Sequence, residues 1–268
     1  MRTKYILTIL VVFFIVVSVQ HSGAQSLTAL EIVTKMQDRE DGDNSISDME
    51  MILIDKNKKT RVRKIRTFTK DKGEDSQRIM FFLSPSDVKG TGFLTYDFDD
   101  YGKDDDQWLY LPALKKVKRI SASDKSSSFM GSDFNYSDMT SKNLPDYNFT
   151  LMKELEIDGV KAWQIQSIPK TTEIMDETGY EKGVIFIRQD NFVAIRGIYW
   201  VYKSNRRKYM EVKNLQIIDG VWTATEIHMT TKEGRESIHK TIIKHHDVRY
   251  NQELNENLFT TRQLEKGL

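Results

Sequence analysis

Residues 208–231 read KYMEVKNLQIIDGVWTATEIHMTT and contain the clearest hairpin pattern in the chain. Apolar and polar residues alternate on both sides of Asp219-Gly220, and an Asp-Gly pair is a preferred two-residue turn between antiparallel strands. Asp158-Gly159 repeats this pattern between two other alternating runs. Both hairpins therefore predict an antiparallel sheet in this half of the chain.

Alternation with period two continues over most of the remaining sequence. Further runs that predict strands lie at residues 49–53, 79–83, 94–98, 108–111, 117–120, 149–157, 162–168, 184–188, 193–202 and 237–248. Roughly eleven to thirteen antiparallel strands at such spacing predict a barrel or a strongly curved sheet. One helix is expected before the strands, because Thr28 and Glu31 form a capping-box pattern ahead of apolar residues at helical spacing.

The first 24 residues have the pattern of a signal peptide. Arg2 and Lys4 precede an apolar run at residues 6–17, and Ser22-Gly23-Ala24 supplies small residues for cleavage. About 12 apolar residues are too few to span a bilayer, which takes about 20 in a helix. We therefore expect a cleaved signal peptide at residues 1–24 and a soluble protein exported to the periplasm.

The composition of the mature chain limits its function. About 244 residues without a low-complexity linker predict a single domain at residues 25–268. Loss of Arg2 and Lys4 would leave 38 Lys plus Arg against 39 Asp plus Glu, a net charge of −1, which gives no bulk attraction to nucleic acid. The chain contains no cysteine, so no disulfide bond stabilises the fold.

Residues 121–145 interrupt the strand pattern. This stretch is rich in serine at first and then carries several large apolar side chains, which disordered segments lack. A loop of about 25 residues in a compact domain commonly has a function. We interpret residues 126–138 as a gate over an opening, centred on Phe129, Met130, Gly131 and Phe134, and an ordinary surface crossover is the alternative.

No motif for catalysis or for cofactor binding occurs. The nucleophile elbow, the phosphate-binding loop and the zinc-hydrolase helix are all absent, so neither an enzyme nor a cofactor is predicted. A two-residue turn at Glu233-Gly234 would place His228 opposite His239, but no third ligand is identifiable and no metal site is expected. The acidic residues 97–106 lack the order of a calcium loop, and we interpret them as a charged hairpin tip.

A basic run, Lys115, Lys116, Lys118 and Arg119, follows the apolar stretch at residues 108–111. Lysines at the edge of a sheet prevent pairing with other chains. The same run could also bind anionic lipid head groups or an acidic partner. The sequence leaves both interpretations open.

Three blocks of sequence resemble a known family. Residues 89–94 read KGTGFL, residues 108–120 read WLYLPALKKVKRI and residues 129–134 read FMGSDF. With the closing segment at residues 259–264 they are similar to the outer membrane lipoprotein-sorting proteins, which resemble the LolA-like periplasmic carriers. The resemblance extends over essentially all of the mature chain.

This resemblance implies a half-open antiparallel barrel, with helices or loops over its mouth and a concave apolar face that holds acyl chains. The implied partners are a lipid or an acylated lipoprotein, and an inner-membrane RND-type transporter; we expect a monomer. Two alternatives remain, namely a non-shuttling accessory of an RND-type lipid exporter and a lipid-modifying enzyme. Alternation selects the lipid-binding face as Met49, Met51, Leu53, Ile79, Phe81, Leu83, Leu94, Tyr96, Trp108, Tyr110, Trp163, Ile165, Ile227 and Met229.

Overall fold

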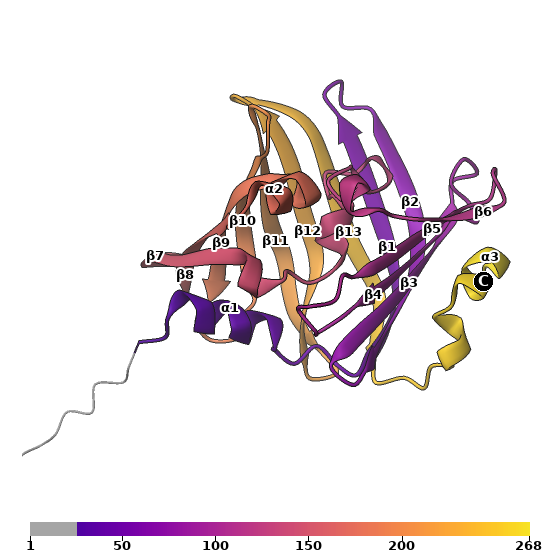
Figure 1. The fold of residues 1–268 in the computed structure, drawn as a ribbon, viewed down its shortest axis with the longest axis horizontal. Coiled ribbons are helices and arrows are strands. Elements are labelled where there is room, and N and C mark those ends of the chain that lie inside the picture. Colours follow the sequence, from indigo (N-terminus) through magenta and orange to yellow (C-terminus); the bar gives the residue numbers. More distant parts are fainter. Residues whose placement is uncertain (1–25) are drawn as a thin grey trace, which may run out of the picture.

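The computed structural model describes residues 26–268, and the signal peptide expected at residues 1–24 lies outside them. A single antiparallel sheet of 13 strands dominates the described chain, in the order β6-β5-β4-β3-β2-β1-β13-β12-β11-β10-β9-β8-β7. This sheet is strongly curved and does not close, because β6 and β7 form its two edges (Figure 1). The expected curved antiparallel sheet is thus confirmed.

The strands are long in the middle of the sheet and short at one edge. Their bounds are β1 Asn44–Asp55, β2 Thr60–Lys72, β3 Asp75–Ser84, β4 Gly92–Asp97, β5 Asp106–Leu111, β6 Lys116–Arg119, β7 Tyr147–Ile157, β8 Val160–Pro169, β9 Tyr180–Arg188, β10 Ala194–Val201, β11 Arg206–Ile218, β12 Val221–Glu233 and β13 Glu236–Tyr250. Helices α1 Ala29–Gln37, α2 Thr172–Thr178 and α3 Thr261–Lys266 complete the fold, with short 3-10 turns at Ala122–Asp124, Phe129–Gly131, Tyr136–Met139, Leu144–Asp146 and Glu256–Leu258. None of the helices in this part of the chain is long and apolar enough to cross a membrane.

Both Asp-Gly pairs form the turns that the sequence predicts. Asp158 and Gly159 join β7 to β8 with φ of 51° and 81°, and Asp219 and Gly220 join β11 to β12 with φ of 50° and 88°. Two positive φ angles match the right-handed twist of the flanking strands. The capping box is also present, because the side chain of Thr28 accepts a hydrogen bond from the Glu31 amide and Glu31 reciprocates.

Three clusters of buried side chains hold the sheet and its coverings together. The groove cluster lies on the concave face and contains Met49, Met51, Leu53, Ile65, Met80, Phe82, Val88, Phe93, Leu109, Ile120, Phe129, Tyr136 and Ile243. The α1 cluster packs Ala29, Ile32 and Val33 against Leu144, Ile165, Ile185 and Ile187. The outer cluster lies on the other face of β3 and β4, where Ile79, Phe81 and Leu94 contact Phe259 and Leu264 from the C-terminal segment.

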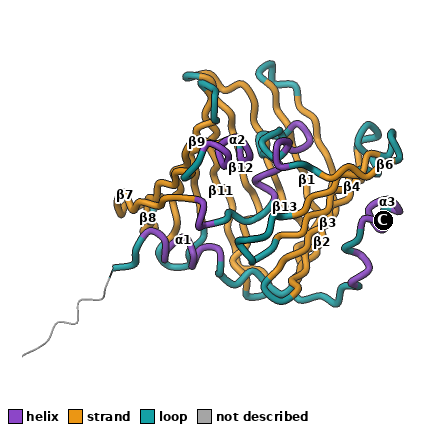
Figure 2. The backbone as a smooth tube through the Cα atoms, viewed as in Figure 1, coloured by secondary structure: helices purple, strands orange, loops and turns teal. Residues whose placement is uncertain are grey.

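The connection from β6 to β7 does not run around the outside of the molecule. It crosses the space inside the curved sheet as loops and short helical turns (Figure 2). Phe129 and Tyr136 belong to the groove cluster, and Leu144 belongs to the α1 cluster. The connection therefore fills the concave side that the curvature of the sheet creates.

Candidate functional site

The candidate site is the concave face of the sheet at the groove cluster, together with the segment that packs on it. We call residues 126–138 the plug. Its tip is a sharp turn, since Met130 and Gly131 both have positive φ, at 50° and 74°. Phe129, at the start of this turn, is only 1% exposed.

The aromatic side chain of Phe129 anchors the plug in the groove. Its ring centroid lies 4.9 Å from that of Phe93 and 6.4 Å from that of Phe82. Tyr136 packs edge-on against Phe129 at 5.4 Å. Met130 and Phe134 pack on the same cluster while partly exposed. Phe129, Met130 and Phe134 of the predicted gate therefore pack on the groove cluster, whereas Gly131 is exposed at the turn.

A buried carboxylate ties the plug to the sheet. Asp133 is 3% exposed and accepts hydrogen bonds from the Thr231 hydroxyl, from Nδ1 of His239 at 2.7 Å and from the Thr241 hydroxyl at 2.6 Å. The Asp133 amide donates in turn to the Thr241 oxygen at 2.9 Å. Three side chains of β12 and β13 thus contact one residue of the plug. We call Asp133 with these partners, Thr231, His239 and Thr241, the Asp133 latch.

Two buried cations also bind the plug. The guanidinium of Arg63 in β2 donates to the backbone oxygen of Met130. Lys208 in β11 donates to Oδ1 of Asn135 at 2.7 Å and to the Tyr180 hydroxyl at 3.2 Å. Burial lowers the pKa values of both Arg63 and Lys208, because neither charge is fully solvated.

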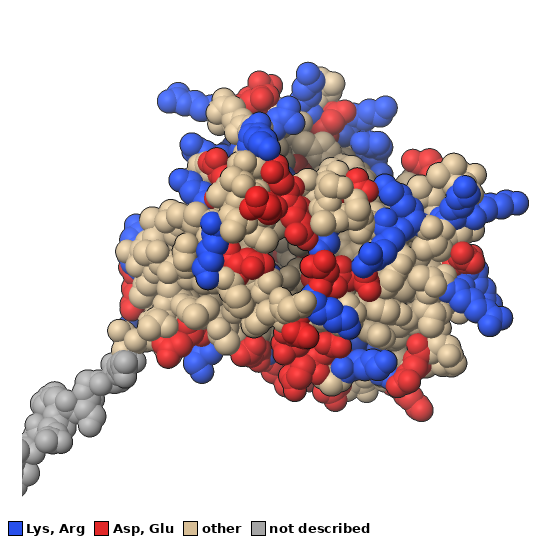
Figure 3. Space-filling view, viewed as in Figure 1, with Lys and Arg blue, Asp and Glu red and all other residues tan. Residues whose placement is uncertain are grey.

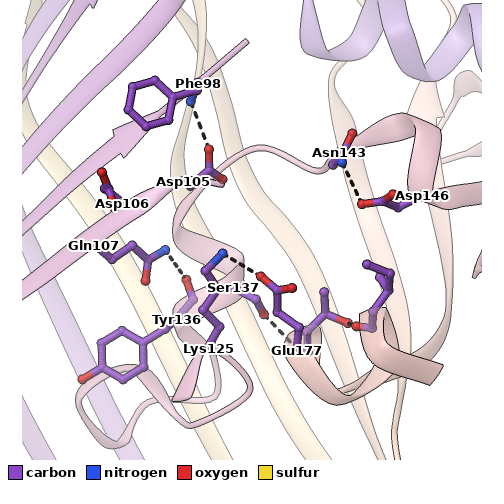
Figure 4. Close-up of polar contacts among 12 residues, drawn as sticks. Phe98, Asp105, Asp106, Gln107, Lys125, Tyr136, Ser137, Asn143, Asp146 and Glu177 are labelled. Atoms are coloured by element: carbon purple, nitrogen blue, oxygen red, sulfur yellow. Dashed lines mark hydrogen bonds and ion pairs between the residues drawn. The ribbon is translucent and has the colours of Figure 1, made fainter. Parts of the chain in front are cut away.

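The base of the plug is bound through backbone and side-chain contacts to neighbouring elements (Figure 4). Gln107 Nε2 donates to the Tyr136 carbonyl at 2.9 Å, and Lys125 Nζ donates to Glu177 of α2 at 2.6 Å. Tyr180 donates from its hydroxyl to Asp138 at 2.7 Å. Burial, together with the nearby Asp138, raises the pKa of Tyr180 well above its usual value.

Five of the predicted lipid-facing residues lie together on the concave face. Met49, Met51 and Leu53 belong to the groove cluster, and Ile227 packs against it. Met229 pairs with Thr241, a latch residue, so it faces the same side. Trp163 and Ile165 also lie together, but in the α1 cluster.

The other predicted lipid-facing residues require a correction. The outer cluster contains Ile79, Phe81, Leu94, Tyr96, Trp108 and Tyr110, on the face opposite to the groove. Leu83 is 37% exposed. Their sequence neighbours Met80, Phe82, Phe93 and Leu109 line the groove instead.

This exchange of faces has a physical cause. Residues 79–83 read IMFFL, a run without alternation, which is typical of a strand buried on both faces. The second face is buried because the C-terminal segment covers it, with the Tyr96 hydroxyl donating to the Phe259 carbonyl at 2.6 Å. At Gly92 a Cβ would lie 2.6 Å from a Leu264 methyl, so a larger residue there would displace α3. The unbroken apolar run indicates that both faces of the strand are buried, and an argument from alternation alone does not detect this.

The expected opposition of two histidines is wrong. The hairpin turn lies at Gly234-Arg235, one residue later than expected, and a register shift follows between Thr231 and Lys232. His228 consequently pairs with Ile242 and His239 pairs with Thr231. His228 contacts Glu226, whereas His239 binds Asp133 on the opposite face. Within residues 26–268 no three His, Cys, Asp or Glu side chains gather as a metal site.

The acidic residues 97–106 lie in the connection between β4 and β5 and at the two strand ends that it joins. Their carboxylates bind backbone amides near the turn: Asp105 accepts from Phe98 at 3.0 Å and Asp100 accepts from Gly102 at 2.9 Å. The basic run follows β5 in the chain. Lys115 lies in the turn to β6, and Lys116, Lys118 and Arg119 lie in β6 itself. Since β6 is a sheet edge, lysines there agree with edge protection.

Comparisons with known proteins identify relatives along most of the chain. A family model that is described only as an uncharacterized protein matches residues 74–266. The crystal structure of a Vibrio parahaemolyticus domain assigned to outer membrane lipoprotein sorting is 32% identical, with a TM-score of 0.78, and the match covers 88% of this chain and 98% of that one. A DUF1329 family protein from Desulfovibrio piger is 28% identical, with a TM-score of 0.78 and coverage of 88% and 97%. No curated protein sequence matches the chain.

A more distant structure shares the fold. A LolA superfamily protein from Nitrosomonas europaea is 18% identical, with a TM-score of 0.66, and the match covers 89% of this chain and all of the other. The two chains thus share a LolA-like fold. On the strength of the 32% identity to the Vibrio parahaemolyticus domain, this chain belongs to the family of outer membrane lipoprotein-sorting proteins.

Proposed function

We propose that the protein is a periplasmic carrier that binds the acyl chains of lipids or lipoproteins on the concave face of its sheet. The observation that carries this proposal is the plug, because Phe129, Met130 and Phe134 occupy an apolar groove from a segment outside the sheet. In this view the plug occupies the place that an acyl chain takes in the loaded protein. Loading requires the plug to leave and an acyl chain to replace it.

The apolar surface of the groove suits such an exchange. Burial of an apolar side chain contributes about 1.5–3 kcal/mol, so three plug side chains contribute less than about 10 kcal/mol. An acyl chain of sixteen carbons offers on the order of 10 kcal/mol at about 0.8 kcal/mol for each methylene. Cargo can therefore offset the loss of the plug. Met49, Met51 and Met80 give the groove unbranched side chains that adapt to a mobile chain.

The polar contacts of the plug suit a gate. Arg63, Lys208 and the Asp133 latch hold it through discrete hydrogen bonds. Each of these groups can bind water when the plug moves out, so opening does not leave buried polar atoms without partners. The contacts fix one closed position and can still be broken one by one.

Binding of this kind needs no covalent step, and we propose no catalytic residue. We further propose that the domain spans residues 25–268, acts as a monomer and exchanges cargo with an inner-membrane partner such as an RND-type transporter. The family's association with lipoprotein sorting supports this direction. A protein that copurifies with lipid would favour a carrier over a non-shuttling accessory of an exporter.

The test uses a reversible lock on the plug. The chain contains no cysteine, so the double variant Asp133→Cys/Thr241→Cys creates a single thiol pair. These two positions are close, because both the amide and the carboxylate of Asp133 contact the Thr241 hydroxyl. A fluorescent fatty-acyl probe should bind the reduced variant and not the oxidised one, and reductant should restore binding.

The same samples provide the controls. Thiol titration confirms that the disulfide has formed, and the two single cysteine variants should bind the probe under both conditions. Mass spectrometry of organic extracts should find acyl lipids in the wild-type protein and fewer in the oxidised variant. Equal probe binding in both redox states, or no binding by the wild type, would contradict the proposal.

A further inference from the structure

The antiparallel order of the strands sorts their connections into two ends of the molecule. At one end lie residues 56–59, 85–91, 112–115, 170–179, 202–205 and 234–235. We call it the plug end, because the residues that hold the plug, such as Arg63, Lys208 and Thr231, lie within a few positions of these turns. At the far end lie residues 73–74, 98–105, 158–159, 189–193 and 219–220.

Charge differs sharply between the two ends. Apart from residues 170–179, which hold the short helix α2, the plug-end turns contain one carboxylate, Asp87, and the cations Lys56, Lys58, Lys59, Lys89, Lys115, Lys203 and Arg235. The far-end turns contain one cation, Lys103, and the carboxylates Glu74, Asp99, Asp100, Asp104, Asp105, Asp158, Asp190 and Asp219. Figure 3 shows the same separation, with Lys and Arg prominent along the upper and right edges and Asp and Glu gathered at the lower centre. A net charge close to zero thus hides a strongly dipolar molecule.

The cations of the plug end are available to a partner. Of the seven, only Lys203 has a carboxylate within 4.0 Å among the described residues, namely Asp176 of α2. This short helix places the acidic Glu173, Asp176 and Glu177 at the same end, where Lys203 and Lys125 pair with two of them. The remaining six cations are exposed and without such a partner in this part of the chain.

Exposed apolar side chains accompany these charges. Leu114 is 63% exposed at the tip beside Lys115, and Val62 is 42% exposed beside the turn that carries Lys58 and Lys59. Cations next to apolar groups suit the interface of a bilayer, where head groups are charged and the region below them is apolar. A hairpin tip can place a cation and an apolar side chain against the same membrane surface.

We propose that the plug end docks on a bilayer surface that carries anionic lipid head groups. The cations are spread over five separate turns around the rim, which matches an extended surface with many charges better than a single acidic peptide. Docking in this orientation points the acidic far end away from the membrane. It also brings the plug next to the bilayer. This inference goes beyond acyl-chain binding and can hold or fail without it.

Vesicle flotation tests the inference. We expect the purified protein to bind vesicles of phosphatidylcholine with phosphatidylglycerol, and to bind pure phosphatidylcholine vesicles much less. Exposed apolar residues contribute to binding of both kinds of vesicle. The difference in binding between anionic and neutral vesicles therefore measures the contribution of charge. High salt should abolish that difference, since exposed charges are screened.

Two triple variants with equal charge locate the surface. Lys56→Gln/Lys58→Gln/Lys59→Gln removes three cations from the plug end, and the partition onto anionic vesicles should fall on the order of 100-fold, at about fivefold for each cation. Lys72→Gln/Lys103→Gln/Lys161→Gln removes three exposed cations near the far end and should leave binding within about twofold. All six side chains are exposed, so neither variant should unfold the protein, which circular dichroism would verify.

Three results would overturn the inference. One is equal binding of the wild type to neutral and anionic vesicles, and another is an equal loss in both triple variants. The third is tight binding of an acidic peptide by the plug end without binding of anionic vesicles, which would identify the partner as a protein. Failure of acyl-probe binding would leave these results unaffected, so the two proposals can be judged separately.

Discussion

Removal of the Asp133 carboxylate should loosen the plug without unfolding the sheet. Asp133→Ala deletes the acceptor of three side-chain hydrogen bonds, from Thr231, His239 and Thr241. A hydrogen bond to a charged group contributes about 1.5–3 kcal/mol, and water regained by the freed donors offsets part of that sum. We expect the closed plug to lose about 3 kcal/mol, which raises its opening equilibrium on the order of 100-fold.

Hydrogen exchange with residue resolution measures this change directly. Amides at residues 126–138 should lose protection by about that factor, whereas amides in the long central strands β1, β12 and β13 should lose less. The global free energy of unfolding should fall by no more than the free energy of plug opening, because the carboxylate contributes nothing once the plug is open. Asp124→Ala is the control, since Asp124 is an exposed carboxylate just outside the plug whose ion pair with Lys118 contributes little.

One pattern would refute this reasoning. If the plug amides of the wild type exchange only through global unfolding, they have the same protection as the strands. If Asp133→Ala then lowers both equally, the plug is a fixed part of the core. In that case the groove has no closed and open states, and an acyl chain could not replace Phe129.

Four further substitutions probe the plug and the strands. Phe129→Ala should leave a cavity that costs about 3–5 kcal/mol at most, and stopped-flow mixing should find faster entry of an acyl probe; slower entry would contradict the gate. Gly131→Ala meets no atom within 4 Å, so only its positive φ should matter, with a loss of about 1–2 kcal/mol in urea unfolding; a neutral effect would mean that the turn relaxes. Burial, with the help of Asp41, raises the pKa of Asp71 to about 6, so the folded state binds the extra proton and stability should fall as the pH rises from about 4 to 6. Burial and the nearby Arg78 lower the pKa of His245 to about 4, which gives the opposite slope up to about pH 6.5 because the unfolded state binds that proton. The free energy of unfolding, measured with urea across this range, should therefore have a more positive slope against pH in Asp71→Asn than in the wild type. In His245→Gln the slope should be more negative. Unchanged slopes would contradict these assignments.

Much of the architecture was predictable because it depends on local signals. The Asp-Gly turns specify their hairpins through positive φ angles that few residue pairs adopt, and the capping box specifies the start of α1. Alternation placed Met49, Met51 and Leu53 on the concave face, since only one face of β1 is fully buried. The burial of Phe129 and Tyr136 was predictable, because large aromatic residues in a segment outside the strand pattern need a place to pack.

The faces of β3, β4 and β5 were not predictable from alternation. These strands carry apolar residues on both sides, and the choice between Phe81 and Phe82 for the groove depends on where the C-terminal segment packs. The pairing of His228 with Ile242 depends on a turn shifted by one residue and on a register irregularity in the ladder. A shift of one residue in the register of a strand moves each of its side chains to the opposite face of the sheet. A small error in a turn therefore becomes a large error in the residues assigned to the site.

The sequence by itself determined the class of fold, the hairpins, the start of the first helix and the family, because each rests on neighbouring residues whose chemistry limits the backbone. Only the tertiary structure placed Asp133 of the plug among Thr231, His239 and Thr241, residues about 100 positions away in the chain. It also gathered the cations of five distant turns at one end of the sheet. The physical reason is that such contacts form between segments brought together by strand order and curvature, and no local pattern records which distant segments will meet.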